Sequence, residues 1–379
     1  MTRTDSKLGR AGLMVGHCAG MVDLVALPVW VGTLISRYHL SPQLAGGMVT
    51  LFLLGAVASS VVLAPLFVRL RGRWVAVAGY GLAGTAFLGT SATHNYSLMT
   101  VLHLFGGIAA GSGLSVTHGT VGRSSNPHRM FALINFALCV FMIAFLALTP
   151  KIIAILGGPA LFEVFAGVML FAAVFSAVAF PESDRPEATS AAAGRVRGEV
   201  WFGILGVSCM ALVQALVFSF VERIGTDRGF GLAAITGVFI ALGFVNLLPA
   251  SFAAMLEKRL SGRAVTLAGP VIQALLALVI TFSSTFLPFA LATAVFSSIV
   301  IFTHTFAFGL LARLDTTGRV VAATPAMLMM GSATGPILGG TLVQSFGYSS
   351  LGAAAAVIAA VAVTGFSMAQ PNRRQVALS

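Results

Sequence analysis

Long apolar runs divide this sequence, and each is close to the length needed to cross a membrane. A helix needs about 20 mostly apolar residues to span the hydrocarbon core of a bilayer. Twelve such runs occur, and they lack the period-two alternation of barrel strands, so we predict an all-α membrane protein with twelve transmembrane helices. The expected spans are Ala11–Ser36, Leu44–Val68, Trp74–Ala92, Leu98–Val121, Met130–Leu156, Pro159–Phe180, Val200–Val221, Phe230–Leu256, Ala264–Ser283, Phe286–Leu311, Val320–Phe346 and Ser349–Ala369.

The composition excludes a water-soluble fold. Hydrophobic residues make up 58% of the chain and charged residues 9%, whereas a soluble domain carries about 25% charged residues. The net charge of +11 does not indicate nucleic-acid binding, because the basic residues lie in short loops between apolar runs and form no basic patch. The three cysteines lie inside apolar runs, so we expect neither a disulfide framework nor a metal site.

The basic residues also predict how the chain is oriented. If the N-terminus is cytoplasmic and the twelve spans alternate, 18 of the 22 Lys and Arg residues fall on the cytoplasmic side. Four fall outside, namely Arg37, Lys151, Arg223 and Arg228. This asymmetry follows the positive-inside rule. We therefore expect a multi-pass protein of a bacterial cytoplasmic (inner) membrane with both termini in the cytoplasm.

A short internal repeat divides the chain into halves. Gly72–Gly79 and Gly262–Gly269 share five of eight residues and lie 190 positions apart, half of a 379-residue chain. Each copy begins where a basic loop enters an apolar run. We predict two six-helix halves, residues 1–180 and 200–379, joined by a polar cytoplasmic linker at 181–199. Halves of six helices have the same orientation and form a parallel repeat.

With these features the chain resembles the major facilitator superfamily, whose loops between helices 2 and 3 and between helices 8 and 9 carry Gly-Arg. Gly72-Arg73 and Gly262-Arg263 match that pattern. The family's acidic loop position holds Arg69 and Arg259 here, with Glu257 nearby, so a charge-pair gate would need different residues. The resemblance implies a pseudo-symmetric fold that works by alternating access, acts on a small molecule in a lipid bilayer, functions as a monomer and needs no cofactor.

Helix 11 carries a second match to the family. Its glycines and proline resemble a Gly-x-x-x-Gly-Pro-x-x-Gly-Gly pattern that exporters of the family carry in helix 5. The matching residues are Gly331, Gly335, Pro336, Gly339 and Gly340. Two interpretations remain open: a sign of export, or a packing seam in which glycines let helices approach closely.

Asp23 is the strongest candidate for chemistry, because it is the one carboxylate well inside a predicted span. An intramembrane charge costs at least about 2.5 to 3.5 kcal/mol on insertion scales, so it is rarely without function. Helical spacing places Gly16, Gly20 and Asp23 on one face, which we expect to turn toward a cavity. We assign Asp23 to proton coupling or substrate contact; the alternative is a satisfied contact between helices.

Histidines and amides supply the remaining polar candidates inside the spans. The resemblance places His103 where many members carry an arginine linked to proton handling, and His17 precedes Asp23 on the same helix. A histidine there can titrate near neutral pH. His118 is a further candidate near the cytoplasmic end of helix 4. The others either line a cavity or tie helices together, and they are Asn135, Gln214, Asn246, Gln273 and His304.

These features favour a proton-coupled secondary transporter that exports a small organic compound by proton antiport. An uptake symporter for a metabolite is the alternative. No Lys or Arg lies in the middle of a span, which favours a neutral, apolar, zwitterionic or cationic substrate. An intramembrane enzyme is a remote third reading: Ala110–Gly113 approaches a serine-protease motif, with His304 as base, but its leading glycine is replaced by alanine.

Overall fold

The computed structural model describes residues 3–63, 66, 69–181, 198–257, 259–314 and 324–369, and most of them are helical. The chain separates into two compact units, Met1–Ser190 and Ala191–Ser379. Most of the expected linker, residues 182–197, lies outside the described residues, as do the last ten residues of the chain. Because the units are separate bodies, each is treated by itself.

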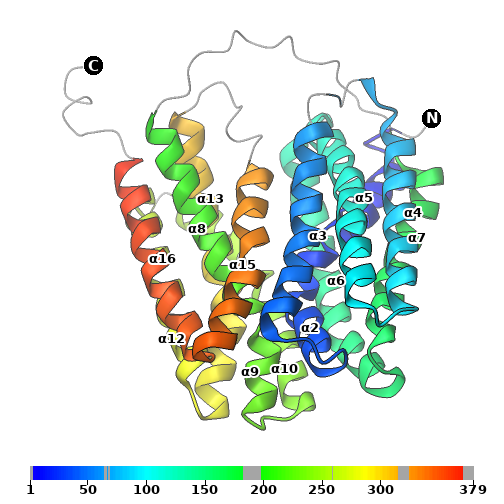
Figure 1. Cartoon of the computed structure of the whole chain (residues 1–379). Coiled ribbons are helices and arrows are strands. Elements are labelled where there is room, and N and C mark those ends of the chain that lie inside the picture. Colours follow the sequence, from blue (N-terminus) through cyan, green and yellow to red (C-terminus); the bar gives the residue numbers. More distant parts are fainter. Residues whose placement is uncertain are drawn as a thin grey trace, which may run out of the picture. The chain divides into compact units, whose positions relative to one another are not determined.

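The described residues of the first unit form seven helices, whose arrangement is drawn in Figure 1. The chain order is α1 Lys7–Gly20, α2 Val22–Ser36, α3 Pro42–Leu63, α4 Gly72–Ser91, α5 Tyr96–Gly122, α6 Pro127–Leu156 and α7 Pro159–Ala179. The first expected span is therefore two helices that meet at Met21. Helix α5 packs against both α3 and α4, and α4 also packs along α7.

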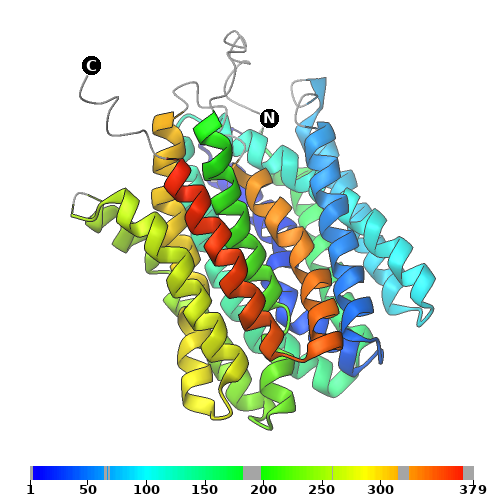
Figure 2. The same ribbon diagram turned by 60° about the vertical axis from the view of Figure 1, so that its left-hand side comes forward.

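The second unit is built from eight described helices (Figure 2). They are α8 Gly198–Phe218, α9 Val221–Asp227, α10 Leu232–Val245, α11 Pro249–Leu256, α12 Gly262–Phe282, α13 Phe286–Leu314, α15 Thr324–Phe346 and α16 Ser349–Met368. Helix α8 packs against α15 and α16, and α12 packs against α13 and α16.

The helices agree with the predicted twelve-span fold. Within the described ranges, ten segments are long and apolar enough to cross a membrane. The other two expected spans are α4, which glycine and threonine make less apolar, and the pair α10–α11. That pair is interrupted between Val245 and Pro249, where Asn246 ends α10 and proline begins α11.

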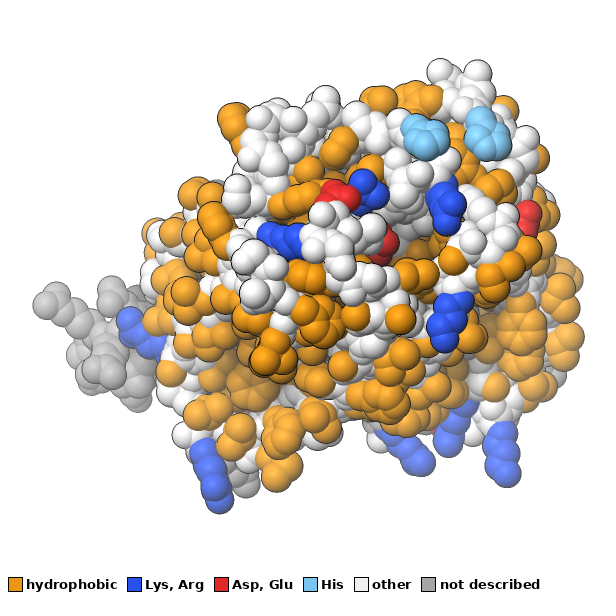
Figure 3. All heavy atoms as spheres, turned by 90° about the horizontal axis from the view of Figure 1, so that it is seen from below, with side chains coloured by type: hydrophobic (Ala, Val, Ile, Leu, Met, Phe, Trp, Pro, Cys, Tyr) orange, Lys and Arg blue, Asp and Glu red, His pale blue; other side chains and the backbone are white. Residues whose placement is uncertain are grey.

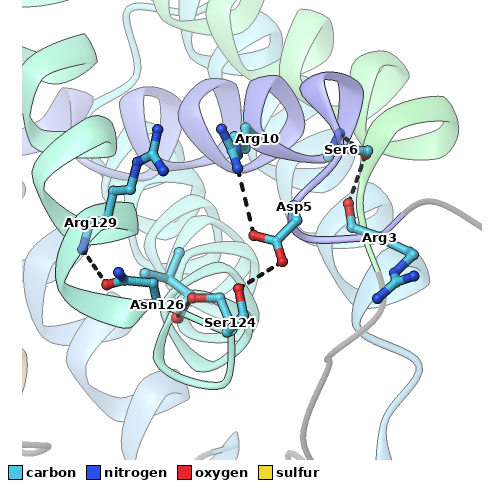
Figure 4. Close-up of polar contacts among 10 residues, drawn as sticks. Arg3, Asp5, Ser6, Arg10, Ser124, Asn126 and Arg129 are labelled. Carbon is cyan, nitrogen blue, oxygen red and sulfur yellow. Dashed lines mark hydrogen bonds and ion pairs between the residues drawn. The ribbon is translucent and has the colours of Figure 1, made fainter.

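Polar residues in the loops fix where the helices begin. Ser6, Asn95 and Asn126 each accept a hydrogen bond from the backbone N–H three residues later, at 2.9, 3.0 and 3.0 Å. Figure 4 shows two of these caps, with Asp5 paired to Arg10 at 3.6 Å between them. Such caps satisfy N–H groups that have no partner inside the helix. Ser125 also donates to Asp5 at 2.7 Å, which ties the N-terminal segment to the α5–α6 turn.

The glycines of the eleventh predicted span, which is α15 in the structure, face α8 in the second unit. A Cβ added at Gly331 would lie 2.1 Å from the Ser208 carbonyl oxygen, and one at Gly335 would lie 2.6 Å from Ala215 Cβ. At Gly339 the added atom would lie 2.8 Å from the Phe220 ring. Pro336 and Gly340 are buried in the same helix. These glycines therefore serve close packing of α15 on α8.

We expect Gly335→Ala to lower the thermal unfolding midpoint of the detergent-solubilised protein. The added methyl group meets the backbone of Leu216 at 2.7 Å, which cannot move aside cheaply. Overpacking of this kind costs about 1 to 3 kcal/mol. The matched control is Gly237→Ala in α10, where no atom lies within 4 Å of the added Cβ.

The control should leave the midpoint unchanged or raise it, because alanine favours a helix over glycine by about 1 kcal/mol. Equal midpoints for the two variants would contradict the close contact between α15 and α8.

Candidate functional site

The first predicted span contains a break one residue before the helix that carries Asp23. Met21 has non-helical dihedral angles (φ −105°, ψ 6°) and separates α1 from α2. Asp23 then lies in the first turn of α2. The start of a helix presents free N–H groups and the positive end of the helix dipole, which favours a carboxylate there. The break therefore places Asp23 beside the N-terminal backbone N–H groups of α2 inside an apolar run.

Asp23 is buried, with 2% of its surface exposed. Its Oδ1 accepts a hydrogen bond from the Leu24 backbone N–H at 2.7 Å. Its Oδ2 has no hydrogen-bond partner among the described residues. A buried carboxylate oxygen without a donor is costly, so the site is one where a proton or a polar ligand group would be stabilising.

One expectation about this helix is wrong. The face that carries Gly16 and Gly20 packs against α5 and does not turn toward a cavity. A Cβ at Gly20 would lie 2.7 Å from Leu114 Cδ1, and one at Gly16 would lie 3.0 Å from Thr117 Oγ1. Glycine spacing alone does not distinguish a cavity face from a packing face, because both need small residues.

Tyr80 packs against two glycines, Gly16 of α1 and Gly113 of α5. Its hydroxyl donates to the Gly16 carbonyl oxygen at 2.8 Å and lies 3.1 Å from Thr117 Oγ1. The side chain comes from α4 and connects it to α1 and α5, with no exposed surface. Nothing in the sequence points to Tyr80, since an isolated tyrosine in an apolar run carries no pattern of its own.

His17 on α1 and His118 on α5 form a pair. Their Nδ1 and Nε2 atoms lie 3.0 Å apart, and the ring centroids are 5.1 Å apart. Between these two nitrogens there is room for one hydrogen, so one ring donates and the other accepts. His17 is buried, and its Nε2 has no hydrogen-bond partner in the described part of the chain.

The pair was not predicted as a pair. His17 and His118 are 101 residues apart, and their positions in the sequence do not indicate a contact. Asn135 on α6 interacts with His17, while its amide also donates to the Phe131 carbonyl oxygen at 2.8 Å. The fold brings the two histidines together, because α1 packs against α5.

His103 lies in an aromatic cluster, which we define as Trp30, Phe52, Phe87, His103, Phe162 and Phe165. Its Nδ1 is 2.7 Å from the Met99 carbonyl oxygen, so it is the nitrogen that carries the hydrogen. Nε2 of His103 is buried and has no hydrogen-bond partner among the described residues. Nε1 of Trp30 has none either. His103 is therefore a buried imidazole enclosed by aromatic rings, an environment that disfavours its charged form.

The amides of the second unit tie helices together. Gln214 on α8 donates to Ser297 Oγ on α13 at 2.6 Å, and Gln273 on α12 donates to the Met210 carbonyl oxygen at 3.0 Å. Asn246 accepts from Ser298 at 2.9 Å, next to the break between α10 and α11. These contacts favour the interpretation that the amides tie helices together over the one that they line a cavity. Gln214 Oε1 is nevertheless buried with no hydrogen-bond partner among the described residues.

His304 on α13 is 5% exposed and stacks near Phe308, with ring centroids 5.6 Å apart. Its ring also interacts with the Val207 backbone of α8. Its Nε2 has no hydrogen-bond partner within the described ranges. Ser112, the serine within Ala110–Gly113, donates to the Ile108 carbonyl oxygen of its own helix at 2.7 Å.

The two basic loops differ in what their arginines do. Arg73 donates to the Phe180 carbonyl oxygen at 3.2 Å, at the end of α7, and Gly72 lies against the Phe180 ring. Arg69, Arg259 and Arg263 are exposed. Glu257 follows α11, and no ion pair joins it to these arginines within the described residues. The expected gating loops thus show a helix-end contact and no charge pair.

A charged cluster lies where α9 and α12 end and α16 begins, at the end of α12 away from the basic loop. Arg228 donates to the Ile280 carbonyl oxygen at 2.7 Å and to the Thr281 carbonyl, where α12 ends. Arg223 pairs with Asp227 at 2.8 Å, and Tyr348 donates to Asp227 at 2.6 Å. Burial, together with the hydrogen bond to Asp227, raises the pKa of Tyr348, so the hydroxyl stays a donor at neutral pH. Figure 3 views the protein from this end.

Buried carboxylate and imidazole groups inside apolar helices are typical of membrane transport proteins. A family profile described as Major Facilitator Superfamily matches residues 13–314. The chain belongs to that family, whose members are secondary transporters.

One solved structure similar to this chain is a crystal structure of the nucleoside transporter NupG, in its D323A mutant. It aligns with a TM-score of 0.71 and 13% identity, over 95% of this chain and 98% of that chain. At this identity the likeness shows a shared fold. A search of curated protein sequences finds no significant match.

We expect Tyr80→Phe to lower the thermal stability of the purified protein by about 1 to 2 kcal/mol, because the variant loses hydrogen bonds to α1 and α5. The measurement is the unfolding midpoint in detergent, with Tyr96→Phe, at a half-buried tyrosine that begins α5, as the control. The control should change stability by less than about 0.5 kcal/mol. A Tyr80→Phe protein as stable as the control would contradict the bridging role of Tyr80.

Proposed function

We propose that this protein is a proton-coupled secondary transporter that exports a small organic compound by proton antiport. The observation that carries the proposal is Asp23, a buried carboxylate at a helix break with one oxygen left without a donor. The family supports transport by alternating access, in which the substrate site opens to one side of the membrane at a time.

A carboxylate in this position suits an exchange of proton and substrate. An unpaired charge is costly inside the membrane, and either a proton or a cationic or hydrogen-bonding substrate would relieve that cost. If the two compete for Asp23, binding of one releases the other, which is antiport. If both must be present together, the same site supports symport, which is the alternative.

The His17–His118 pair is the second proton-transfer site that we propose. His17 precedes Asp23 by six residues on the same span, a rise of about 9 Å along a helix. The shared hydrogen between the two rings lets the pair accept a proton at one outer nitrogen and give it up at another. We therefore assign the pair to proton transfer between Asp23 and the α1 end that carries Lys7 and Arg10.

The substrate class follows from the charges inside the spans. Asp23 is negative when deprotonated, and no Lys or Arg lies in the middle of a predicted span. A neutral, apolar, zwitterionic or cationic compound fits this balance, whereas a multiply charged anion does not.

The first test measures the pH inside liposomes that hold the purified protein while candidate compounds are added outside. For antiport, a compound that enters the lumen drives protons out, and the lumenal pH rises. A fall in lumenal pH would indicate symport and overturn the export proposal. No change with any compound that the same liposomes demonstrably take up would contradict proton coupling.

We expect Asp23→Asn to abolish accumulation of substrate against its gradient while substrate exchange continues. The amide keeps the shape of the side chain but cannot release a proton. The measurement compares uptake of labelled substrate under a pH gradient with exchange at equal pH. Glu163→Gln, at an exposed carboxylate near the start of α7, removes the same charge and should accumulate substrate normally.

Full pH-driven accumulation of substrate by the Asp23→Asn variant would contradict the proposal that Asp23 carries the coupled proton. Loss of exchange as well would instead place Asp23 in the substrate site.

We further expect His17→Phe and His118→Phe to slow pH-driven transport by similar factors, and the double variant to be no slower than either single one. Residues that act as one unit show strongly non-additive effects. His94→Phe, at an exposed loop histidine, is the control. Independent, multiplying effects of the two variants would show that the histidines do not work as a pair.

A further inference from the structure

An apolar groove of about 840 Å³ runs along the outer side of α4 and α5 in the first unit. Trp74, Leu82 and Phe105 line it and are exposed by 58, 62 and 61%. Figure 1 shows α5 between α3 and α4, and no extended packing joins those two outer helices. At the bottom of the groove α4 and α5 pack closely, because a Cβ added at Gly79 would lie 2.6 Å from the Ala109 carbonyl oxygen.

The polar groups inside the groove are already satisfied. Thr85 donates to the Leu82 carbonyl oxygen at 2.9 Å, and Ser112 donates to the Ile108 carbonyl oxygen at 2.7 Å. Both hydroxyls therefore bond their own helices. The groove offers an occupant apolar contact along its length, as a hydrocarbon chain requires.

Arg71 stands at one end of the groove. It is the N-cap residue of α4, is exposed, and lines the same groove as Trp74. In the described part of the chain no carboxylate lies within ion-pair distance of it. A residue that flanks the end of a spanning helix lies at the level of the lipid headgroups, where arginine and tryptophan are typical.

The internal repeat marks Arg71 as special to the first half. At the 190-residue offset, Arg69 and Arg73 correspond to Arg259 and Arg263, but Arg71 corresponds to Ser261. Ser261 caps α12 by accepting from the Ala264 backbone N–H at 3.3 Å. Arg73 is engaged with Phe180, and Arg71 is the cation among the residues that line the groove.

We propose that this groove binds an anionic phospholipid, with one acyl chain along α4 and α5 and the phosphate paired with Arg71. The groove follows α4 from Trp74 to Ala86, a rise of about 18 Å, slightly more than half of a hydrocarbon core about 30 Å thick. One chain from one leaflet therefore fits its length. The site is independent of the transport mechanism proposed for Asp23.

The test uses tryptophan fluorescence in vesicles that mix phosphatidylcholine with lipids carrying brominated acyl chains, which quench a nearby indole. Trp201→Phe leaves Trp74 in the groove, and Trp74→Phe leaves Trp201, which is 61% exposed near the start of α8. Trp30 is fully buried and common to both variants.

We expect half-maximal quenching of Trp74 at about a fivefold lower mole fraction of brominated phosphatidylglycerol than of brominated phosphatidylcholine. This factor corresponds to about 1 kcal/mol for one arginine at the membrane surface. Trp201 should show no such preference. Arg71→Gln should abolish the preference at Trp74, and Arg259→Gln, the matched charge change in the second half, should leave it intact.

A second pair of variants tests the groove itself. Ala78 is exposed in the groove, and Ala268 is its exposed counterpart at the 190-residue offset. Ala78→Phe should reduce quenching of Trp74 by both lipids, and Ala268→Phe should not.

Equal quenching of Trp74 by the two lipids would overturn the proposal, since an annular lipid without a site would give that result. A preference that survives Arg71→Gln, or that appears equally at Trp201, would also overturn it. Such a result would show that the net charge of +11 attracts anionic lipid everywhere.

Discussion

The fold depends on one constraint: inside a bilayer, each polar group must find its partner within the protein. Helices meet this demand for the backbone, and hydrogen bonds such as those of Gln273 and Tyr80 meet it for side chains. Asp23 is one of several described residues at which this demand is left partly unmet, and it is the carboxylate among them. The helix break at Met21 brings it one backbone N–H and leaves its second oxygen free. A site that a proton or a substrate can complete is what a coupled transporter requires.

The two halves share a repeat but not its chemistry. At the 190-residue offset, Asp23 corresponds to Val213, and His118 corresponds to Phe308. The first unit holds the buried carboxylate, the histidine pair and the aromatic cluster around His103. The second unit holds amides that bond helix to helix, and a glycine seam between α8 and α15. The residues proposed for proton coupling thus lie in the first unit, although the second unit also holds a buried imidazole, His304.

The sequence predicted the spans well, because hydropathy is a local property that each segment carries in its own composition. The break between α10 and α11 falls at Asn246 and Pro249, residues that disfavour a continuous helix. The break at Met21 had no such sign, since the residue itself is an ordinary apolar one. The His17–His118 contact, the bridge made by Tyr80 and the bond from Arg73 to Phe180 join distant segments, and no spacing along the chain encodes them.

The most direct measurement of coupling at Asp23 follows proton release when substrate binds. Purified protein in weakly buffered detergent solution would be mixed with a compound that moves lumenal pH in the liposome assay, and a pH dye would record the change. We expect wild-type protein to release close to one proton for each substrate bound, and Asp23→Asn to bind substrate without release. Equal release from both proteins would show that the exchanged proton resides elsewhere.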